Sequence, residues 1–382
     1  MKKLSILLFS VLFFTISSSF AQDVPEEEKP NPIEFSGSVD AYFRANLTAK
    51  NAGAGASVPG TSFANQSGFA LGMVNLIAKK EGKKVGFVAD LVFGPRGADA
   101  VFGATTASSS IVNQLYAYWN VSEKVTLTIG NFNTYLGYEV ISPADNFNYS
   151  TSYMFSYGPF SHSGLKADFA LSEDVSAMLS IMNPTDGTDF NLAGTYTLGA
   201  QLGFKGLYLN FLYGDQDGKL DKDYINGLAS ASSSGSTFQF DLTGGWDLSE
   251  TLYVGINATY NTTSAGVVYD GTSIKDSNGD ASDFVGIAGY VQLATSDTFS
   301  IGTRVEYFSE VNGGAGAIGT YDASGDASII DITLTGQYKV GDLTIIPELR
   351  LDSGSEDGTF LDKNLKASKS LSSFVLAAVY SF

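Results

Sequence analysis

From residue 34 to its last residue, 382, the chain consists of short runs in which apolar and polar residues alternate. The runs are joined in turn by a tight turn and by a long polar loop. The tight turns fall at residues 80–83, 121–124, 171–174, 204–206, 248–251, 294–297 and 340–342, and the long loops include residues 48–65, 94–110, 132–160, 214–235 and 353–370. Strict alternation of short and long connections is typical of an up-and-down barrel, because its two rims face different compartments. The pattern predicts an all-β, antiparallel barrel that spans a membrane.

The runs predict about sixteen strands, roughly the number at which such a barrel encloses water instead of filling itself with side chains. The expected strands cover residues 34–47, 66–79, 84–93, 111–121, 123–131, 160–171, 174–183, 192–204, 205–213, 236–248, 250–263, 283–296, 297–310, 327–340, 341–352 and 371–382. The barrel domain is therefore expected to be residues 34–382. Pro347 lies within a strand, where it removes a backbone donor, so we expect a local bulge there.

Side chains alternate between the two faces of a strand, so the phase of each run assigns its residues to lipid or to lumen. In the first run one face carries Phe35, Val39, Ala41, Phe43 and Leu47, and the other carries Ser36, Ser38, Asp40, Arg44 and Asn46. A soluble β-sandwich alternates in the same way, so this pattern alone leaves that fold open.

Aromatic residues favour the membrane barrel over the sandwich. If the chain starts in the periplasm, aromatic residues of the apolar face gather at both ends of the strands, as expected at two lipid–water interfaces. They are Trp119, Phe204, Trp246, Tyr338, Tyr380 and Phe382 at the inner end, and Phe43, Phe93, Tyr213, Tyr260 and Tyr307 at the outer end. The sequence thus predicts a barrel with both termini in the periplasm.

The two ends of the chain predict its location. Lys2 and Lys3 precede an apolar stretch over residues 4–16, and Ser19 and Ala21 supply small residues two apart, which is the layout of a signal peptide over residues 1–21. The run is too short for a membrane-spanning helix. Residues 22–33, rich in Pro and Glu, are expected to form a periplasmic tail. The last strand ends in Phe382 and resembles the carboxy-terminal signature that the barrel-assembly machinery recognises in the outer membrane of Gram-negative bacteria.

Composition excludes several classes of function. The net charge of -18 argues against nucleic acid as a partner, and the absence of cysteine excludes thiol chemistry. The one histidine, His162, lies between Ser161 and Ser163, which a strand directs to the opposite face, so no Ser–His dyad forms locally. We predict no enzyme, no cofactor and no transition-metal site. Acidic loop residues such as Asp276 and Asp280 resemble parts of calcium loops, but solvated loops are the simpler interpretation.

Residues 133–160 and the four residues that follow carry the order Gly-x-Glu, Asn, Tyr-Ser-x-Ser, Phe, Pro and His-Ser-Gly. This order resembles the signature segment of the OmpL-like β-barrel porins (porin type 2), common in Bacteroidetes. The resemblance covers the barrel in outline and this segment in detail, and it implies a porin without indicating a solute. The motif residues are Gly137, Glu139, Asn146, Tyr149, Ser150, Ser152, Pro159, His162 and Gly164.

The same segment follows the fifth strand and is rich in aromatic residues, so residues 133–160 are expected to fold into the lumen as a constriction loop. Glu139 and Asp145 would then face arginines of the wall, and the opposed charges would create a transverse field in the pore. The expected arginines are Arg44, Arg304 and Arg350. Two alternatives remain open: the loop caps the outer rim, or the arginines pair with Asp40, Glu306 and Glu348 on the wall.

The sequence as a whole predicts a passive diffusion channel for small hydrophilic solutes. The alternative is a structural or surface-interaction barrel with a plugged lumen. Expected partners are the lipid and lipopolysaccharide of the outer membrane, with a homotrimer as a possible assembly. Lumen-phased acids outnumber lumen-phased bases, which predicts a mild preference for cations. The acids are Asp40, Asp90, Asp168, Asp241, Glu306, Asp331 and Glu348, and the bases are Arg44, Lys166, Arg304 and Arg350.

Overall fold

The computed structural model describes residues 31–220, 228 and 230–382. The predicted signal peptide and residues 22–30 of the predicted tail lie outside this part of the chain and stay predictions. Residues Ile33–Phe382 form one compact unit. Within the described residues, no helix has the length and apolar character needed to cross a membrane.

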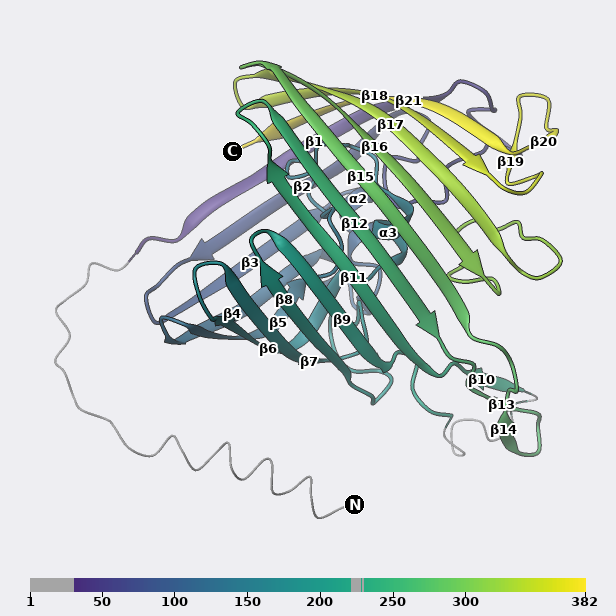
Figure 1. Ribbon diagram of the computed structural model, residues 1–382, viewed down its shortest axis with the longest axis horizontal. Helices are drawn as coiled ribbons and strands as arrows, with labels where there is room; N and C mark the ends of the chain where they lie inside the picture. Colours follow the sequence, from purple (N-terminus) through teal and green to yellow (C-terminus); the bar gives the residue numbers. More distant parts are fainter. Residues whose placement is uncertain (1–30, 221–227, 229) are drawn as a thin grey trace. The chain divides into compact units, whose positions relative to one another are not determined.

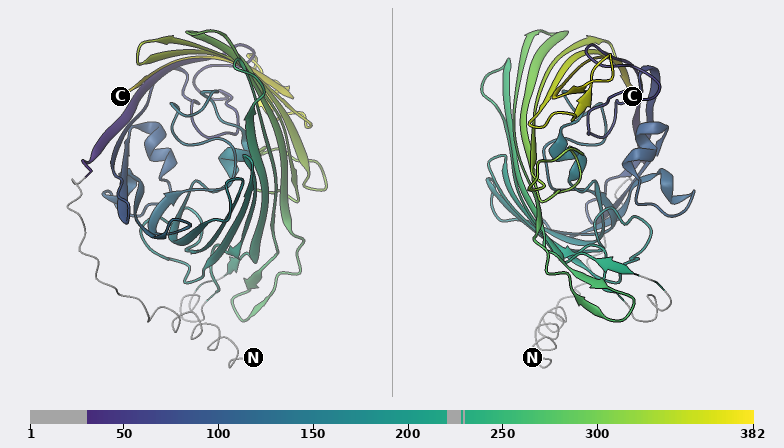
Figure 2. Two further views of the ribbon diagram at one scale, coloured as in Figure 1. Left: turned by 60° about the vertical axis from the view of Figure 1, so that its left-hand side comes forward. Right: turned by 90° about the vertical axis from the view of Figure 1, so that its right-hand side faces the viewer.

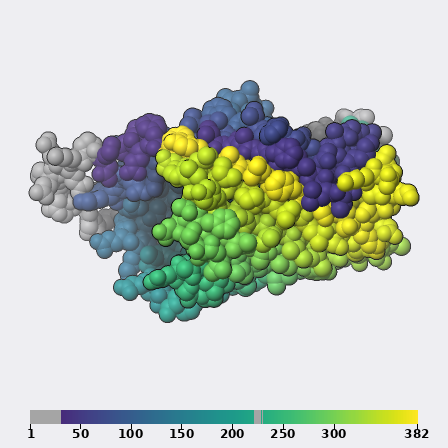
Figure 3. Space-filling model, turned by 90° about the horizontal axis from the view of Figure 1, so that it is seen from above, coloured from purple at the N-terminus to yellow at the C-terminus, as the bar shows by residue number. Residues whose placement is uncertain are grey.

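Sixteen antiparallel strands close into one barrel, as predicted (Figure 1). Each strand pairs with its neighbour in the chain, and the first strand pairs with the last, which Figure 3 shows as purple residues beside yellow ones. The strands are β1 (Glu34–Asn46), β2 (Gly68–Lys80), β3 (Val85–Phe93), β4 (Val112–Ser122), β5 (Val125–Asn133), β6 (Ser161–Ala170), β7 (Val175–Met182), β8 (Thr197–Phe204), β9 (Leu207–Asp215), β11 (Ser236–Asp247), β12 (Leu252–Thr263), β15 (Ser282–Ser296), β16 (Phe299–Val311), β17 (Ala327–Val340), β18 (Leu343–Gly354) and β21 (Ser370–Ser381).

Smaller elements lie in the long loops. Two short helices and a 3-10 turn follow β3 and β5, and two small sheets lie beyond the barrel. They are α2 (Pro95–Ala100), η1 (Ser109–Ile111) and α3 (Tyr153–Tyr157), the sheet of β10 (Ala231–Ser233), β13 (Val267–Tyr269) and β14 (Ile274–Asp276), and the sheet of β19 (Phe360–Leu361) and β20 (Ala367–Ser368).

The predicted strand boundaries agree with the structure to within a few residues, except at β8. That strand begins at Thr197, whereas the pattern predicted residue 192. A turn occupies the difference, because the Asn191 side chain accepts the Gly194 N–H (2.8 Å) and donates to the Thr195 carbonyl (2.5 Å). Asparagine commonly forms such turns with its own backbone, and this feature outweighs the apolar alternation.

The predicted phase is confirmed by the exposure of the side chains. On β1, Phe35 is 76% exposed on the outer face, whereas Arg44 is 1% exposed on the lumen face. On β16, Val305 is 45% exposed and its neighbour Arg304 is fully enclosed. The predicted aromatic belts also lie outside, with Trp119 51% exposed. An outward apolar surface and a polar interior are what a barrel in lipid requires.

The predicted bulge at Pro347 is wrong. The partners Thr335↔Glu348 and Tyr338↔Ile345 keep one register on both sides of Pro347, although the two pairs between them are lost. Gly336 lies beside the ring, and a Cβ there would come 3.4 Å from Pro347 Cγ. The small neighbour leaves space for the ring, so the strand passes it without an extra residue.

The space inside the barrel is occupied by residues 134–160, named here the inward segment, and by α2. Figure 2 shows the teal chain around α3 within the ring of strands. The buried apolar residues lie mainly where these parts meet the wall, because the outer face belongs to lipid. One cluster joins Tyr153 and Met154 of the inward segment to Phe284 and Phe308 of the wall. The buried apolar core of this protein therefore lies inside the lumen, between the inward segment and the barrel wall.

Candidate functional site

The inward segment is held by carboxylates of one side of the barrel, named here the anchor wall and formed by β15, β16, β17 and β18. Glu306 accepts the backbone N–H of Tyr153 (2.8 Å) and of Met154 (2.7 Å). These are N–H groups of the first turn of α3, which have no partner within the helix. A carboxylate there is favoured by hydrogen bonding and by the helix dipole. Ser152 caps the same helix, because its Oγ accepts the Phe155 N–H (3.1 Å).

A second carboxylate holds the chain just before this helix. Glu348 accepts the backbone N–H of Tyr149 (2.9 Å), and the Tyr149 hydroxyl donates to Asp40 of β1 (2.5 Å). Glu348 and Tyr149 are almost fully enclosed. Buried acceptors on rigid strands thus fix the backbone of a segment that has little regular structure of its own.

Arg304 joins the inward segment to the anchor wall. Its Nη1 lies 2.6 Å from Glu139 Oε1 in the inward segment, and its Nη2 lies 2.7 Å from Asp331 Oδ2 on β17. Nη1 also donates to the Ser150 carbonyl (2.7 Å). All three charged side chains are nearly fully enclosed. A buried charge requires partners of this kind, since its hydration has been lost.

The predicted constriction residues are thus arranged differently from the expectation. Glu139 and Arg304 are in contact, so their charges do not face one another across water. Arg350 lies under the same segment, where it pairs with Asp352 (2.8 Å) and donates to the Thr151 carbonyl (2.7 Å). Arg44 is also buried. Of the five, Asp145 alone is exposed.

The alternative pairing predicted for the arginines is not formed either. Asp40, Glu306 and Glu348 were the expected partners, but these carboxylates accept hydrogen bonds from N–H and O–H groups. Arg304 and Arg350 pair with Asp331, Asp352 and Glu139 instead, and no described residue hydrogen-bonds either Nη atom of the buried Arg44.

Three glycines of the lumen face receive side chains of the inward segment. A Cβ on Gly255 would come 2.6 Å from the Tyr138 ring, and a Cβ on Gly302 would come 2.5 Å from the Phe147 ring. Gly286 lies in the same way against Met154. Glycine within a strand often marks a site of close approach. These positions show that the wall is shaped for this segment.

The family-motif residues mostly hold the inward segment in its own fold. Gly137 has a φ of 86°, which favours glycine, and its N–H donates to Asp241 on β11 (2.9 Å). The Asn146 side chain accepts from the Val140 N–H (3.0 Å) and donates to its carbonyl (2.5 Å). Glu139, Tyr149, Ser150 and Ser152 make the contacts described above.

The remaining motif residues lie where the segment joins β6. His162 Nε2 lies 2.9 Å from Thr134 Oγ1, which ties the end of the segment to its beginning. Gly164 allows close strand contact, since a Cβ there would come 2.6 Å from Met182 Cα. Pro159 directly precedes the last residue of the segment. The motif therefore specifies the shape of the segment, and a reaction centre is not needed to explain it.

A loop carboxylate also fixes this junction. Asp186, between β7 and β8, accepts the backbone N–H of Phe160 (2.7 Å) and of Ser161 (3.0 Å). Burial raises the pKa of Asp186 to about 6, although the two N–H groups act in the opposite direction. The protonation state of Asp186 at this junction therefore changes near pH 6.

Sequence patterns did not indicate the role of Arg96. This residue of α2 is buried, donates to the carbonyls of Ile141 (2.9 Å) and Tyr149 (3.2 Å), and lies 4.3 Å from the centre of the Phe63 ring. It lies in a loop, where the alternation of strands carries no information. The Pro-Arg-Gly sequence that begins α2 was the one signal present in the chain.

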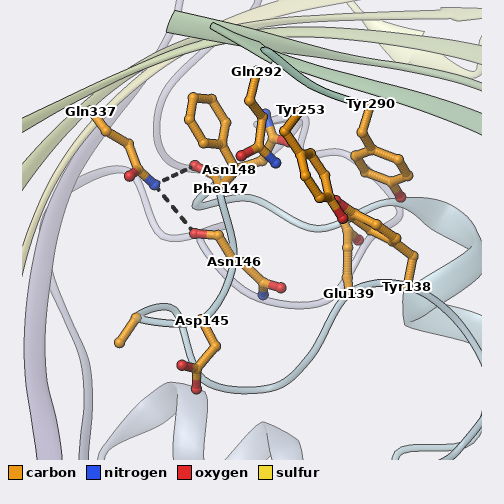
Figure 4. A pocket seen from close by; sticks show the side chains of 11 residues that line it. Tyr138, Glu139, Asp145, Asn146, Phe147, Asn148, Tyr253, Tyr290, Gln292 and Gln337 are labelled. Atoms are coloured by element: carbon orange, nitrogen blue, oxygen red, sulfur yellow. Dashed lines mark hydrogen bonds between the residues drawn. The ribbon is translucent and has the colours of Figure 1, made fainter. Parts of the chain in front are cut away.

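A pocket of about 370 Å³ lies between the inward segment and the wall. Figure 4 shows Tyr253 of β12 and Tyr290 and Gln292 of β15 extending toward loop residues, with Gln337 of β17 bonded to the backbone of the loop. The pocket is lined by Tyr138, Glu139, Ala144, Asp145, Asn146, Phe147, Asn148, Tyr253, Tyr290, Gln292 and Gln337. Aromatic rings and amides dominate this lining.

Across the lumen, the inward segment covers less of the opposite wall than it covers of the anchor wall. Here β4, β5, β6 and β7 carry lumen-phased residues that are half-buried, among them Tyr116, Thr126 and Ser176. Lys166 and Asp168 form an ion pair of 2.9 Å whose side chains are 26% and 40% exposed. Water therefore reaches this side of the lumen.

Comparisons with known proteins agree with this geometry. A family model described as "Putative beta-barrel porin-2, OmpL-like" matches residues 32–382. No curated protein sequence matches the chain.

Three solved structures are similar in fold. The outer-membrane channel DcaP of Acinetobacter baumannii has a TM-score of 0.54 at 12% identity, over 92% of this chain and 97% of that chain. A loop L8 deletion mutant of OmpT from Vibrio cholerae has a TM-score of 0.53 at 11% identity, over 93% and 100%. An anion-selective porin from Comamonas acidovorans has a TM-score of 0.53 at 10% identity, over 92% and 99%.

Proposed function

Because this chain belongs to the OmpL-like β-barrel porin-2 family of the Gram-negative outer membrane, we propose that it is a passive diffusion channel for small hydrophilic solutes. In this proposal the inward segment forms the constriction, and solutes pass between it and the opposite wall. Transport through such a pore needs a polar path and a fixed cross-section, and needs no chemical step.

The asymmetry of the lumen is the observation that carries the proposal. The inward segment is attached to the anchor wall through buried contacts of Arg304, Glu306 and Glu348. The polar residues of the opposite wall remain partly exposed. A segment attached to one side narrows a barrel without filling it, which supports a channel over a closed structural barrel.

Single-channel conductance in a planar bilayer tests the proposal. The variant replaces residues 139–152 by a short Gly-Ser linker, which removes the contact between Glu139 and Arg304 and the loop bonds of Glu348. We expect a larger conductance per channel, because the carboxylates and arginines of the wall become hydrated and the water path widens.

A matched control shortens residues 266–279, which form the exposed loop between β12 and β15. This variant should conduct like the unmodified protein. Both variants must first show the compact, heat-modifiable form of a folded barrel on gels. Unchanged conductance in the first variant would contradict the constriction, and an unmodified protein that is silent at every voltage would support the plugged structural barrel instead.

A further inference from the structure

The pocket between the inward segment and the wall is lined by aromatic rings and side-chain amides, which a simple water path does not require. We propose that it is a binding subsite for a neutral sugar of one or two rings. The proposal rests on the channel function, because it places the subsite beside the water path, at the edge of the inward segment where Ala144 and Asp145 are exposed.

The aromatic rings form a preorganised surface. The rings of Tyr138 and Tyr290 are stacked with their centres 4.0 Å apart, and the Tyr138 hydroxyl lies 3.0 Å from that of Tyr253. Phe147 is fixed over Gly302. Tyr253 and Phe147 remain half-buried, so part of each ring is available in the pocket. The C–H faces of a sugar ring are apolar and pack on surfaces of this kind.

Polar groups suited to hydroxyls lie beside these rings. Gln292 pairs directly with Tyr253 across β12 and β15, so the amide and the ring are immediate neighbours. No described residue hydrogen-bonds the Gln292 side chain, and the buried Tyr290 hydroxyl likewise has no partner in the described part of the chain. An amide both donates and accepts, which matches a sugar hydroxyl that does the same.

The charges of the pocket argue against ionic solutes. Among the described residues that line it there is no lysine or arginine, so an anion finds no counter-charge. Glu139 is already paired with Arg304, which leaves Asp145 as the free carboxylate, at the exposed edge. Tyr138 and Tyr290 cover each other's faces, so they do not form an open aromatic cage for a cation.

The size of the pocket indicates how much of a ligand it can hold. Its volume of about 370 Å³ lies near the lower end of the range of about 300–1,000 Å³ that small-molecule sites occupy. A mono- or disaccharide would fill a pocket of this volume. The subsite would slow the passage of such a solute without trapping it, since conduction requires weak binding.

Equilibrium binding of maltose to the folded full-length barrel in detergent micelles tests the subsite without requiring conduction. We expect saturable binding that Gln292→Leu and Tyr253→Leu each weaken by about tenfold, the loss expected for one hydrogen bond or one ring contact. The control is Tyr116→Leu, which removes a half-buried tyrosine of the opposite wall and should bind like the unmodified protein. Absence of saturable maltose binding, or equal affinity in all four proteins, overturns the proposal. Displacement of bound maltose by choline or succinate at equal concentration also overturns it, because the site would then accept ions.

Conductance in the presence of maltose separates this inference from the proposed function. A conducting channel whose current maltose reduces, with less reduction in Gln292→Leu, supports both. A conducting channel that shows neither maltose binding nor current reduction overturns the subsite and leaves the channel intact. Maltose binding by a protein that conducts no current supports the site as a ligand pocket but overturns both the channel and the role of the subsite in transport.

Discussion

Two sides of the same lumen carry similar residues in opposite surroundings. β16 and β5 lie across the ring of sixteen strands from each other. On the anchor wall the ion pair of Arg304 with Asp331 is fully enclosed, whereas on the opposite wall the pair of Lys166 with Asp168 is 26% and 40% exposed. Strand phase is the same for both pairs, so phase alone does not tell whether a lumen residue meets water. The inward segment makes the difference, because it covers one wall and leaves the other open.

The difference has an energetic consequence. In water an ion pair contributes little, since each charge is well hydrated without its partner. Under the inward segment the charges have lost that hydration, and removing one partner leaves the other exposed to a medium of low polarity. Matched substitutions on the two walls therefore measure how completely water is excluded from the contact between the inward segment and the anchor wall.

The largest effect on the free energy of unfolding is expected from Arg304→Met, with Lys166→Met as the matched substitution on the opposite wall. The first leaves Glu139 without its cation and leaves Asp331 with only the more distant Arg350 (3.5 Å), and it should lower the free energy of unfolding by about 3–5 kcal/mol. The second breaks an exposed pair and should cost about 0–1 kcal/mol. Urea titration of the barrel refolded in lipid vesicles measures both. Equal losses would mean that water reaches the anchor wall and that the two sides do not differ.

A smaller effect is expected from Glu306→Gln, compared with Asp168→Asn. The glutamine keeps the shape but loses the charge that accepts the N–H groups of Tyr153 and Met154, and should cost about 1.5–3 kcal/mol. The asparagine should be nearly neutral. Proteolysis of the folded barrel adds a local readout, because a loosened α3 should be cleaved faster in Glu306→Gln alone. Equal cleavage of both variants would argue against a capping role for Glu306.

The junction at Asp186 should respond to pH. Its folded pKa of about 6 lies above the value of about 3.9 for an unperturbed Asp, so the folded state binds the proton more tightly. The contribution to stability is therefore complete below about pH 4 and is lost as the pH rises to about 6. Asp186→Asn should remove this slope, and asparagine also tolerates the φ of 63° there. Urea titrations between pH 4 and 7 measure it, and an unchanged slope in the variant would contradict the assignment.

The smallest effect concerns ion selectivity. The sequence predicted a mild preference for cations from the excess of lumen-phased acids, and this stays a prediction. The structure reduces the expected cation preference, because most of these acids are shielded from the water path. Their exposed fractions are 8% for Asp40, 3% for Asp90, 1% for Asp241, 0% for Glu306, 0% for Asp331 and 1% for Glu348. We expect a weakly cationic reversal potential in a KCl gradient that declines as salt screens the charges. An anionic sign would show that the buried arginines govern the narrowest point.

The sequence located the strands well because a strand in a lipid-exposed barrel has a local signature. Apolar and polar residues must alternate, and interfacial rings such as Trp119 and Phe204 mark the ends. The errors lie where another local effect is stronger, as with the Asn191 turn before β8, or where a neighbour relieves a constraint, as Gly336 does for Pro347. The motif around Glu139 and Tyr149 likewise identified the family from sequence alone.

By itself the sequence determined the fold, the lipid and lumen faces and the family, since each rests on residues close in the chain. The tertiary structure decided which lumen charges are paired and which meet water. Arg304 and Glu139 are 165 residues apart in the chain, and no periodicity connects them. Their contact depends on how an irregular segment settles inside a closed wall. That position is set by burial and by the need of each buried donor and charge for a partner, and these become defined only once the barrel has closed.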